Sequence, residues 1–124
     1  MDQKRLEELT EGLLYMSETD APLEFYQLDS AAARQWPPAA VAQFLELIGE
    51  DPGEPIQAIP PEQFFEELRQ GNDPDQVQAL QTAFSEELEE LRCYRVGEVE
   101  IQIYLLGRDR PGRVVGLNTL SVET

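Results

Sequence analysis

The sequence contains no histidine, the residue that most often serves as general base and as metal ligand in proteins. It also lacks a glycine-rich phosphate-binding loop, a G-x-S-x-G nucleophile motif and any cluster with metal-ligand spacing. The chain has 25 acidic residues, so pairs of carboxylates arise by chance and do not indicate acid–base catalysis. These absences predict that the chain is not an enzyme and has no cofactor of its own.

Cysteine is almost absent as well. Cys93 is the only one, so no internal disulfide can form, which is typical of proteins from a reducing compartment. Because no histidine is available to activate it, we expect Cys93 to be a buried structural residue rather than a nucleophile.

Long apolar runs are also missing. No stretch approaches the roughly 18 consecutive apolar residues that a membrane-spanning helix requires. The first residues, MDQKRLEEL, include acidic side chains and do not resemble a secretory signal. We therefore expect a soluble, cytoplasmic protein.

Acidic residues are abundant, and basic residues are few. The 25 Asp and Glu residues oppose 9 Lys and Arg residues, which gives a net charge of −16. Residues 1–91 carry 21 acidic and 4 basic residues, a net charge of −17, whereas residues 92–124 have a net charge of +1. Such a chain is repelled by free nucleic acid and by anionic membranes, which leaves open a basic protein partner, a bound cation or a tail-like solubilising role.

The length of 124 residues predicts one domain, residues 1–124, with a hydrophobic core of its own. Apolar spacings of three and four residues predict helices over residues 2–16, 37–49, 61–71 and 73–91. Short apolar or alternating stretches predict strands over residues 23–28, 56–59, 99–105 and 114–122. The strand over 99–105 is expected to be half-buried and to form an antiparallel hairpin with the last strand. Because most helices precede the long strands, the pattern favours an α+β fold with a mixed sheet packed by helices.

Two polar segments are candidates for binding. The loop Ser17, Glu18, Thr19 and Asp20 exposes two carboxylates and two hydroxyls, which either satisfy local backbone groups or contact a partner. At the other end of the chain, a strand pattern runs almost to the last residue, so Glu123 and Thr124 are expected to lie close to the sheet. The pairs Glu86-Glu87 and Glu89-Glu90 are instead expected on the solvated side of the long helix, without a specific role.

Two segments resemble the nuclease A inhibitor (NuiA) family, whose members block sugar-non-specific, Mg²⁺-dependent endonucleases. The first is EGLLYMSETDAPLEFY, and the second is YRVGEVEIQIYLLG followed by GLNTLSVET; they cover residues 11–26, 94–107 and 116–124. The resemblance implies an α/β/α sandwich similar to the PR-1-like arrangement, with a mixed, partly antiparallel sheet.

The resemblance also implies a mechanism and a partner. Glu18, in Met16-Ser17-Glu18, matches the family's glutamate that ligates the catalytic Mg²⁺ of the nuclease, and Thr124 matches its terminal threonine, whose carboxylate approaches the same metal. The implied partner is a ββα-metal endonuclease with a basic cleft, and the implied contact residues are Ser17, Glu18, Thr19, Asp20, Glu123 and Thr124. No direct contact with nucleic acid or membrane is implied.

One departure from the family concerns tryptophan. In the family, a tryptophan that anchors the interface lies in the loop between the Phe-Phe helix and the long helix. Here that loop, residues 70–75, has no aromatic residue, and the only tryptophan is Trp36. Two other interpretations stay open: an acidic module that mimics nucleic acid for another basic protein, and an enzyme with a PR-1-like fold, which the missing histidine disfavours.

Overall fold

The computed structural model describes residues 1–124 and shows an α+β fold. The helices are α1 (Gln3–Thr10), α2 (Ser30–Ala33), α3 (Gln43–Leu47), α4 (Pro61–Leu68) and α5 (Pro74–Glu87). The strands are β1 (Leu14–Met16), β2 (Asp20–Pro22), β3 (Glu24–Gln27), β4 (Ile56–Ile59), β5 (Glu89–Val96), β6 (Glu100–Arg108) and β7 (Val114–Val122).

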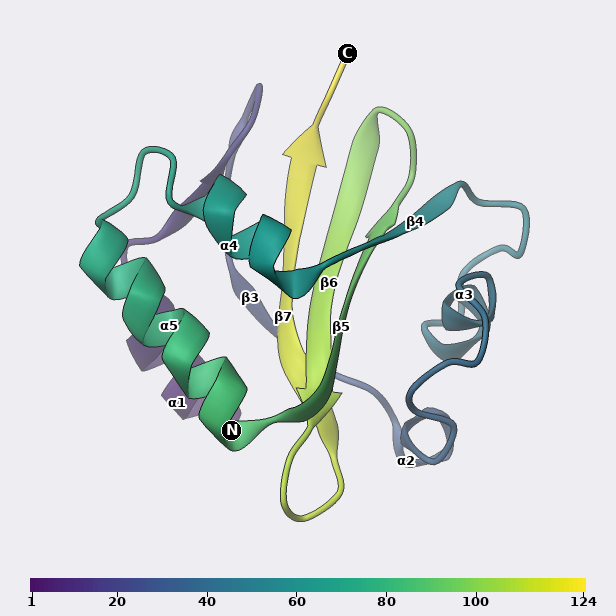
Figure 1. Cartoon of the computed structure of the whole chain (residues 1–124). Helices are drawn as coiled ribbons and strands as arrows, with labels where there is room; N and C mark the ends of the chain where they lie inside the picture. Colours follow the sequence, from purple (N-terminus) through teal and green to yellow (C-terminus); the bar gives the residue numbers. More distant parts are fainter.

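Five strands form the central sheet, in the order β3-β7-β6-β5-β4 (Figure 1). Every neighbouring pair in this sheet is antiparallel, so the expectation of a mixed sheet is wrong. The reason lies in the connections: no helix carries the chain from one strand to a parallel neighbour, and β5, β6 and β7 follow one another through short turns. The predicted hairpin of the last two strands is confirmed.

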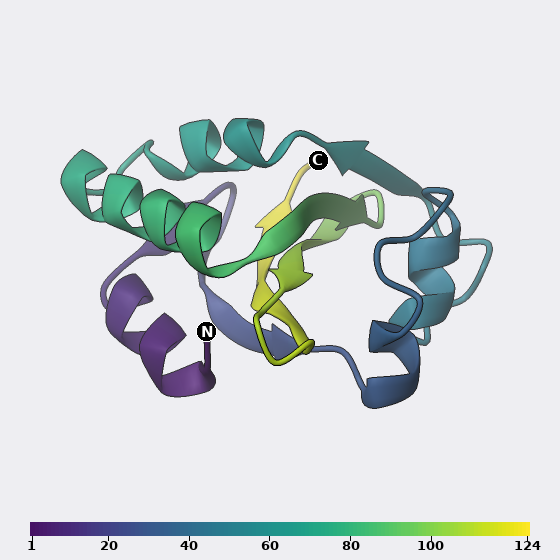
Figure 2. The ribbon, with the colours of Figure 1, turned by 60° about the horizontal axis from the view of Figure 1, so that its bottom comes forward.

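Helices lie on both faces of the sheet (Figure 2). One face packs against α1, α4 and α5 around a cluster that includes Leu6, Phe65 and Leu80. The other face packs against α2 and α3 around a second cluster that includes Trp36 and Phe44. The central strands are therefore buried on both sides, because alternate residues of each strand enter different clusters.

The burial of β6 differs from the half-buried strand that the sequence predicts. Ile103 and Leu105 face the first cluster, as expected, while Tyr104 and Leu106 are also buried and face the second. Only the beginning of the strand, near Glu100 and Gln102, keeps a polar side. The segment from α2 to α3 covers the remainder.

The first helix is shorter than predicted. It ends at Thr10, and the residues from Leu14 to Met16 form a strand instead of two further helical turns. Gly12 adopts a φ of +80°, a left-handed conformation that ends the helix and that glycine accepts without a steric penalty. Leu13 and Tyr15, two positions apart as in a strand, are both buried in the core. The helical spacing of the leucines and Met16 in the sequence does not predict this alternation.

The long helix also ends early, at Glu87, so Glu89 and Glu90 lie in β5 and not on a helix surface. Leu88 has extended backbone angles, and together with Leu91 it packs over Gly107 of β6, where a Cβ atom would lie 2.9 Å from either leucine. Leu88 and Leu91, which the sequence assigns to the helix, therefore contact the sheet from positions beyond the end of α5.

The helix predicted over residues 37–49 is likewise reduced. It comprises only α3, because the residues from Trp36 to Ala42 form turns, while α2 occurs in a stretch where no helix was predicted. Asp29 caps α2 by accepting a hydrogen bond from the Ala32 N–H at 2.9 Å.

The two ends of the sheet differ in what they carry. We call the end that holds the β1–β2 turn, the β5–β6 turn and residues 123–124 the site end, and the end that holds the β6–β7 turn the far end. The chain begins at the far end, where the Met1 amino group lies 4.0 Å from an Asp109 carboxylate oxygen. In Figure 1 the two termini accordingly lie at opposite ends of the molecule.

Candidate functional site

The loop predicted to bind a partner is the turn of a small hairpin. β1 and β2 pair with Tyr15 opposite Ala21 and Met16 opposite Asp20, which leaves Ser17, Glu18 and Thr19 to form the turn. The Ser17 hydroxyl donates a hydrogen bond to the Thr19 carbonyl oxygen at 2.8 Å, which closes the turn locally. Glu18 is exposed at its tip.

The turn is bound to the end of β7. The Val122 N–H donates to the Ser17 hydroxyl at 3.0 Å, and the Glu18 N–H donates to the Val122 carbonyl oxygen at 3.3 Å. These hydrogen bonds join residues more than one hundred positions apart in the sequence. Ser17 therefore serves backbone groups of two segments, which agrees with the structural interpretation that the sequence left open for it.

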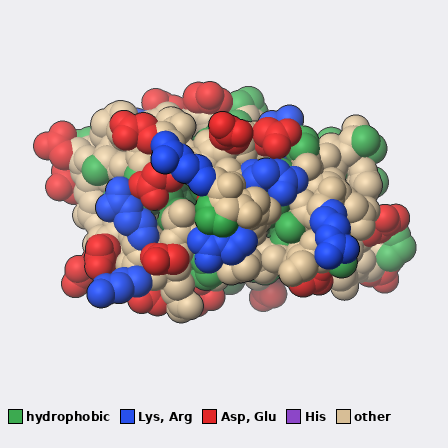
Figure 3. All heavy atoms as spheres, turned by 90° about the horizontal axis from the view of Figure 1, so that it is seen from below, with side chains coloured by type: hydrophobic (Ala, Val, Ile, Leu, Met, Phe, Trp, Pro, Cys, Tyr) green, Lys and Arg blue, Asp and Glu red, His purple; other side chains and the backbone are tan.

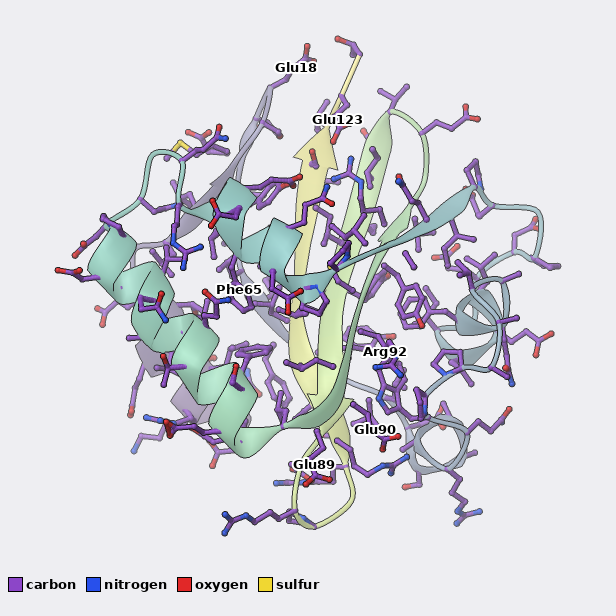
Figure 4. All side chains as sticks on the ribbon, in the orientation of Figure 1. Glu18, Phe65, Glu89, Glu90, Arg92 and Glu123 are labelled. Atoms are coloured by element: carbon purple, nitrogen blue, oxygen red, sulfur yellow. The ribbon has the colours of Figure 1, made fainter.

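Glu18 and Thr124 lie together at the site end. The Thr124 hydroxyl donates a hydrogen bond of 2.6 Å to a Glu18 carboxylate oxygen, and both residues are exposed. Figure 4 shows Glu18 at the tip of its hairpin, close to the end of the chain, with Glu123 at the end of β7. The two residues proposed from the resemblance to act on one metal ion are thus neighbours in space.

Glu123 has intramolecular partners. Its carboxylate accepts hydrogen bonds from the Arg95 guanidinium and from the Ser121 hydroxyl, the latter at 2.7 Å. These two donors hold the pKa of the Glu123 carboxyl below its ordinary value. The carboxylate is therefore ionised at neutral pH and bound to the protein's own side chains.

A groove of about 610 Å³ opens beside these residues. It lies between the β1–β2 turn, the end of β7, β4 and α4, and its lining is mostly polar. At its side the Tyr15 hydroxyl donates to a Glu67 carboxylate oxygen at 2.6 Å, and burial together with this hydrogen bond raises the pKa of Tyr15. The sequence did not predict that residues of β5 and α4, above all Arg95, belong to this groove.

Thr19 and Asp20 occupy a different position from the other predicted residues. They line a separate hollow of about 300 Å³, with Glu24 and Asn118 among its other residues, and do not line the groove. Both are exposed. The structure therefore brings Ser17, Glu18, Glu123 and Thr124 together at the groove and places Thr19 and Asp20 at the separate hollow.

Trp36 lies far from this site. It is 5% exposed in the second cluster, its ring contacts Phe44 and Tyr94 edge-on, and its indole N–H donates to the Glu90 carbonyl oxygen at 3.0 Å. It cannot take the place of an interface tryptophan in the α4–α5 loop. The apolar side chain beside that loop is Met16, which is 41% exposed.

Met16 fits against the loop because Gly71 has no side chain. A Cβ atom at Gly71 would lie 2.7 Å from the Met16 sulfur, so the two segments approach as closely as a glycine permits. Asn72 fixes the same loop to β1, since its side-chain amide donates to the Leu14 carbonyl oxygen at 2.8 Å. An exposed methionine thus lies next to the acidic tip of the hairpin.

Glu89, Glu90 and Cys93 do not belong to the site. The structure contains no group of three or more His, Cys, Asp or Glu residues placed to hold a metal ion. Glu89 and Glu90 lie toward the far end of the sheet (Figure 4). Cys93 is 1% exposed, as the sequence predicts for a structural cysteine, and burial raises its pKa to about 12.

Comparison with known proteins identifies the family. The family model described as nuclease A inhibitor-like protein matches residues 2–124. The chain belongs to the nuclease A inhibitor-like family. The match extends through residues 29–60 and includes both the β1–β2 turn and the last residues of the chain. Membership of this family indicates that the protein is a nuclease inhibitor and binds a nuclease.

A search of curated proteins found no match for this nuclease A inhibitor-like chain. None of its helices has both the length and the apolar character needed to cross a membrane.

Proposed function

We propose that the protein inhibits a sugar-non-specific, Mg²⁺-dependent DNA/RNA endonuclease of the ββα-metal class by placing carboxylates at the catalytic metal. The observation that carries this proposal is the 2.6 Å hydrogen bond between the Thr124 hydroxyl and the Glu18 carboxylate. It joins the two residues to which the resemblance assigns metal-directed roles, and both are exposed at one end of the molecule.

The chemistry follows from the ligand preferences of Mg²⁺. This ion takes hard oxygen ligands in octahedral geometry and usually keeps several waters, so a carboxylate can replace a water or a substrate phosphate oxygen. With Glu18 in that position and the terminal carboxylate of Thr124 beside it, the metal could neither bind the scissile phosphate nor deliver a water nucleophile. The inhibitor would act as an anionic substitute for the substrate.

The net charge supports the same partner. An enzyme that binds a polyanion has a basic cleft, and a partner of charge −16 is complementary to it. Ser17 supports the proposal indirectly, because its hydroxyl fixes the turn that presents Glu18. Thr19 belongs to that turn and Asp20 and Met16 flank it, and all three would contact the rim of the cleft.

The test is the variant Glu18→Gln, which keeps the size of the side chain and removes its charge. We expect binding to the nuclease to weaken by about 2–5 kcal/mol, the range for removing one member of a desolvated charge pair. The matched control is Glu86→Gln, an exposed residue at the end of α5, which should change binding by less than about 1 kcal/mol. Inhibition by Glu18→Gln at the level of the unmodified protein would contradict the proposal.

A further inference from the structure

A single cation lies among the carboxylates that line the groove. Arg95 of β5 is the only Lys or Arg residue there, while Glu18, Glu67 and Glu123 also contribute to the lining. Its side chain is 14% exposed, and its guanidinium forms an ion pair with the Glu123 carboxylate. Because a charge held this far from water needs a fixed partner, the pair constrains both residues.

Glu123 is held by three groups from different parts of the sheet. Its carboxylate binds Arg95 and the Ser121 hydroxyl, and its N–H donates to the Val99 carbonyl oxygen at 2.8 Å. The regular pairing of β7 stops at Val122, so these contacts hold the chain in place beyond the end of the strand. The side chain of Thr124, the next residue, forms a hydrogen bond with Glu18.

We propose that Arg95 is a positioning residue, which through Glu123 fixes the last two residues of the chain so that Thr124 and Glu18 are presented as one unit. What this unit does for a partner rests on the proposed function; that Arg95 orders it does not. Arginine suits this task because its planar guanidinium offers several donors in a fixed geometry. Order established before binding lowers the entropy cost of forming a complex.

The first experiment uses the free protein and needs no nuclease. In Arg95→Gln, we expect NMR relaxation to show increased mobility at Thr124, while amide protons in the centre of β7 keep their protection. Arg95→Lys keeps the charge and should restore part of the order. If Thr124 is equally ordered in Arg95→Gln and in the unmodified protein, the proposal is overturned.

The matched control is Arg5→Gln. Arg5 forms an ion pair of 2.8 Å with Glu87 on the α1–α5 side of the molecule, away from the groove. The variant removes the same charge and an ion pair of the same type, so it reports the effect of charge and stability alone. We expect it to leave the mobility of Thr124 unchanged.

The second experiment measures inhibition of a sugar-non-specific, Mg²⁺-dependent endonuclease acting on DNA. We expect Arg95→Gln to bind about 10- to 100-fold more weakly, the range for losing a group that orients a metal ligand, and Arg5→Gln to bind as the unmodified protein does. Glu123→Gln should weaken binding similarly, and combining it with Arg95→Gln should add little, because both changes break one contact.

The outcomes separate the two proposals. Mobile Thr124 in Arg95→Gln combined with undiminished inhibition would overturn the role of Arg95 in presenting the unit. If the unmodified protein inhibits no such endonuclease, the proposed function fails, while the mobility of Thr124 still decides whether Arg95 orders the end of the chain.

Discussion

At the scale of single residues, the polar side chains of the site end divide into those that bind other parts of the protein and those that remain available. Ser17 and Glu123 belong to the first group, since their side chains bind backbone or side-chain groups of other segments. Glu18 belongs to the second, because its carboxylate accepts a hydrogen bond from the Thr124 hydroxyl alone, which a metal ion could replace. Glu18 is therefore the side chain on which metal-directed inhibition depends most.

Cys93 gives a prediction at the same scale. Burial raises its pKa to about 12, so at pH 8 nearly all of the thiol is protonated and covered by the core. We expect a thiol reagent to modify the folded protein very slowly at pH 8 and to react rapidly once denaturant unfolds it. The measurement is the rate of modification by mass spectrometry, and rapid modification of the folded protein would contradict the buried position of Cys93.

At the scale of elements, the sequence predicts the presence of most helices and strands but misplaces several of their ends. Leu13 and Met16 fit a helical spacing, and so do Leu88 and Leu91, although all four lie beyond the helices. Apolar residues three or four positions apart are also compatible with a helix followed by a strand, and contacts with the sheet decide between the two. The packing of Leu88 and Leu91 over Gly107 is such a contact, and it cannot be inferred from local spacing.

The candidate site could be predicted only in part. The residues alone left the Ser17–Asp20 loop with two interpretations, and the resemblance to the inhibitor family supplied the pairing of Glu18 with Thr124. Arg95 was not predicted, because a lone arginine in a strand has no local signature of an ion pair with a distant residue. Its partner lies 28 positions away, beyond the end of another strand, so only the folded structure reveals it.

The end of β7 gives a prediction at the element scale. A short tag after Thr124 would turn its carboxylate into an amide and add bulk at the site end, and deleting Glu123 and Thr124 would withdraw the anion by about 6–7 Å. We expect both changes to weaken inhibition sharply. An N-terminal tag of the same length is the control, because Met1 lies at the far end, and it should leave inhibition unchanged.

The measurement is inhibition by the three proteins, with circular dichroism to verify that each is folded. Equal inhibition by the C-terminally tagged and the untagged protein would show that Thr124 lies outside the interface.

At the scale of the whole molecule, charge is separated along the sheet as well as along the sequence. Within residues 92–124, the acidic residues Glu98, Glu100 and Glu123 lie at the site end, while Arg108 and Arg113 lie at the far end. Figure 3, which shows the molecule from the far end, displays Lys and Arg side chains between the acidic ones. Several of these cations form ion pairs there, including Arg108 with Glu90 and Arg113 with Asp109. A basic partner can therefore be attracted to the site end, where Arg95 is the only Lys or Arg residue that lines the groove.

This separation predicts how association depends on charge and salt. We expect the association rate with the nuclease to fall as salt rises, with a smaller change in the dissociation rate. Glu100→Gln at the site end should slow association more than Glu86→Gln on α5, although both glutamates are exposed and each substitution changes the net charge by one unit. Rates from stopped-flow or surface plasmon resonance decide this, and equal effects of the two variants would show that only net charge matters.

The most direct test of the account compares binding with and without the metal. Affinity for the nuclease is measured for the unmodified protein and for Glu18→Gln, each with Mg²⁺ and each after Mg²⁺ has been removed by a chelator. If the Glu18 carboxylate binds the catalytic metal, the unmodified protein should lose affinity when Mg²⁺ is removed, while Glu18→Gln should bind weakly and almost equally in both conditions. A Glu18→Gln protein that retains the full dependence on Mg²⁺ would contradict the central claim.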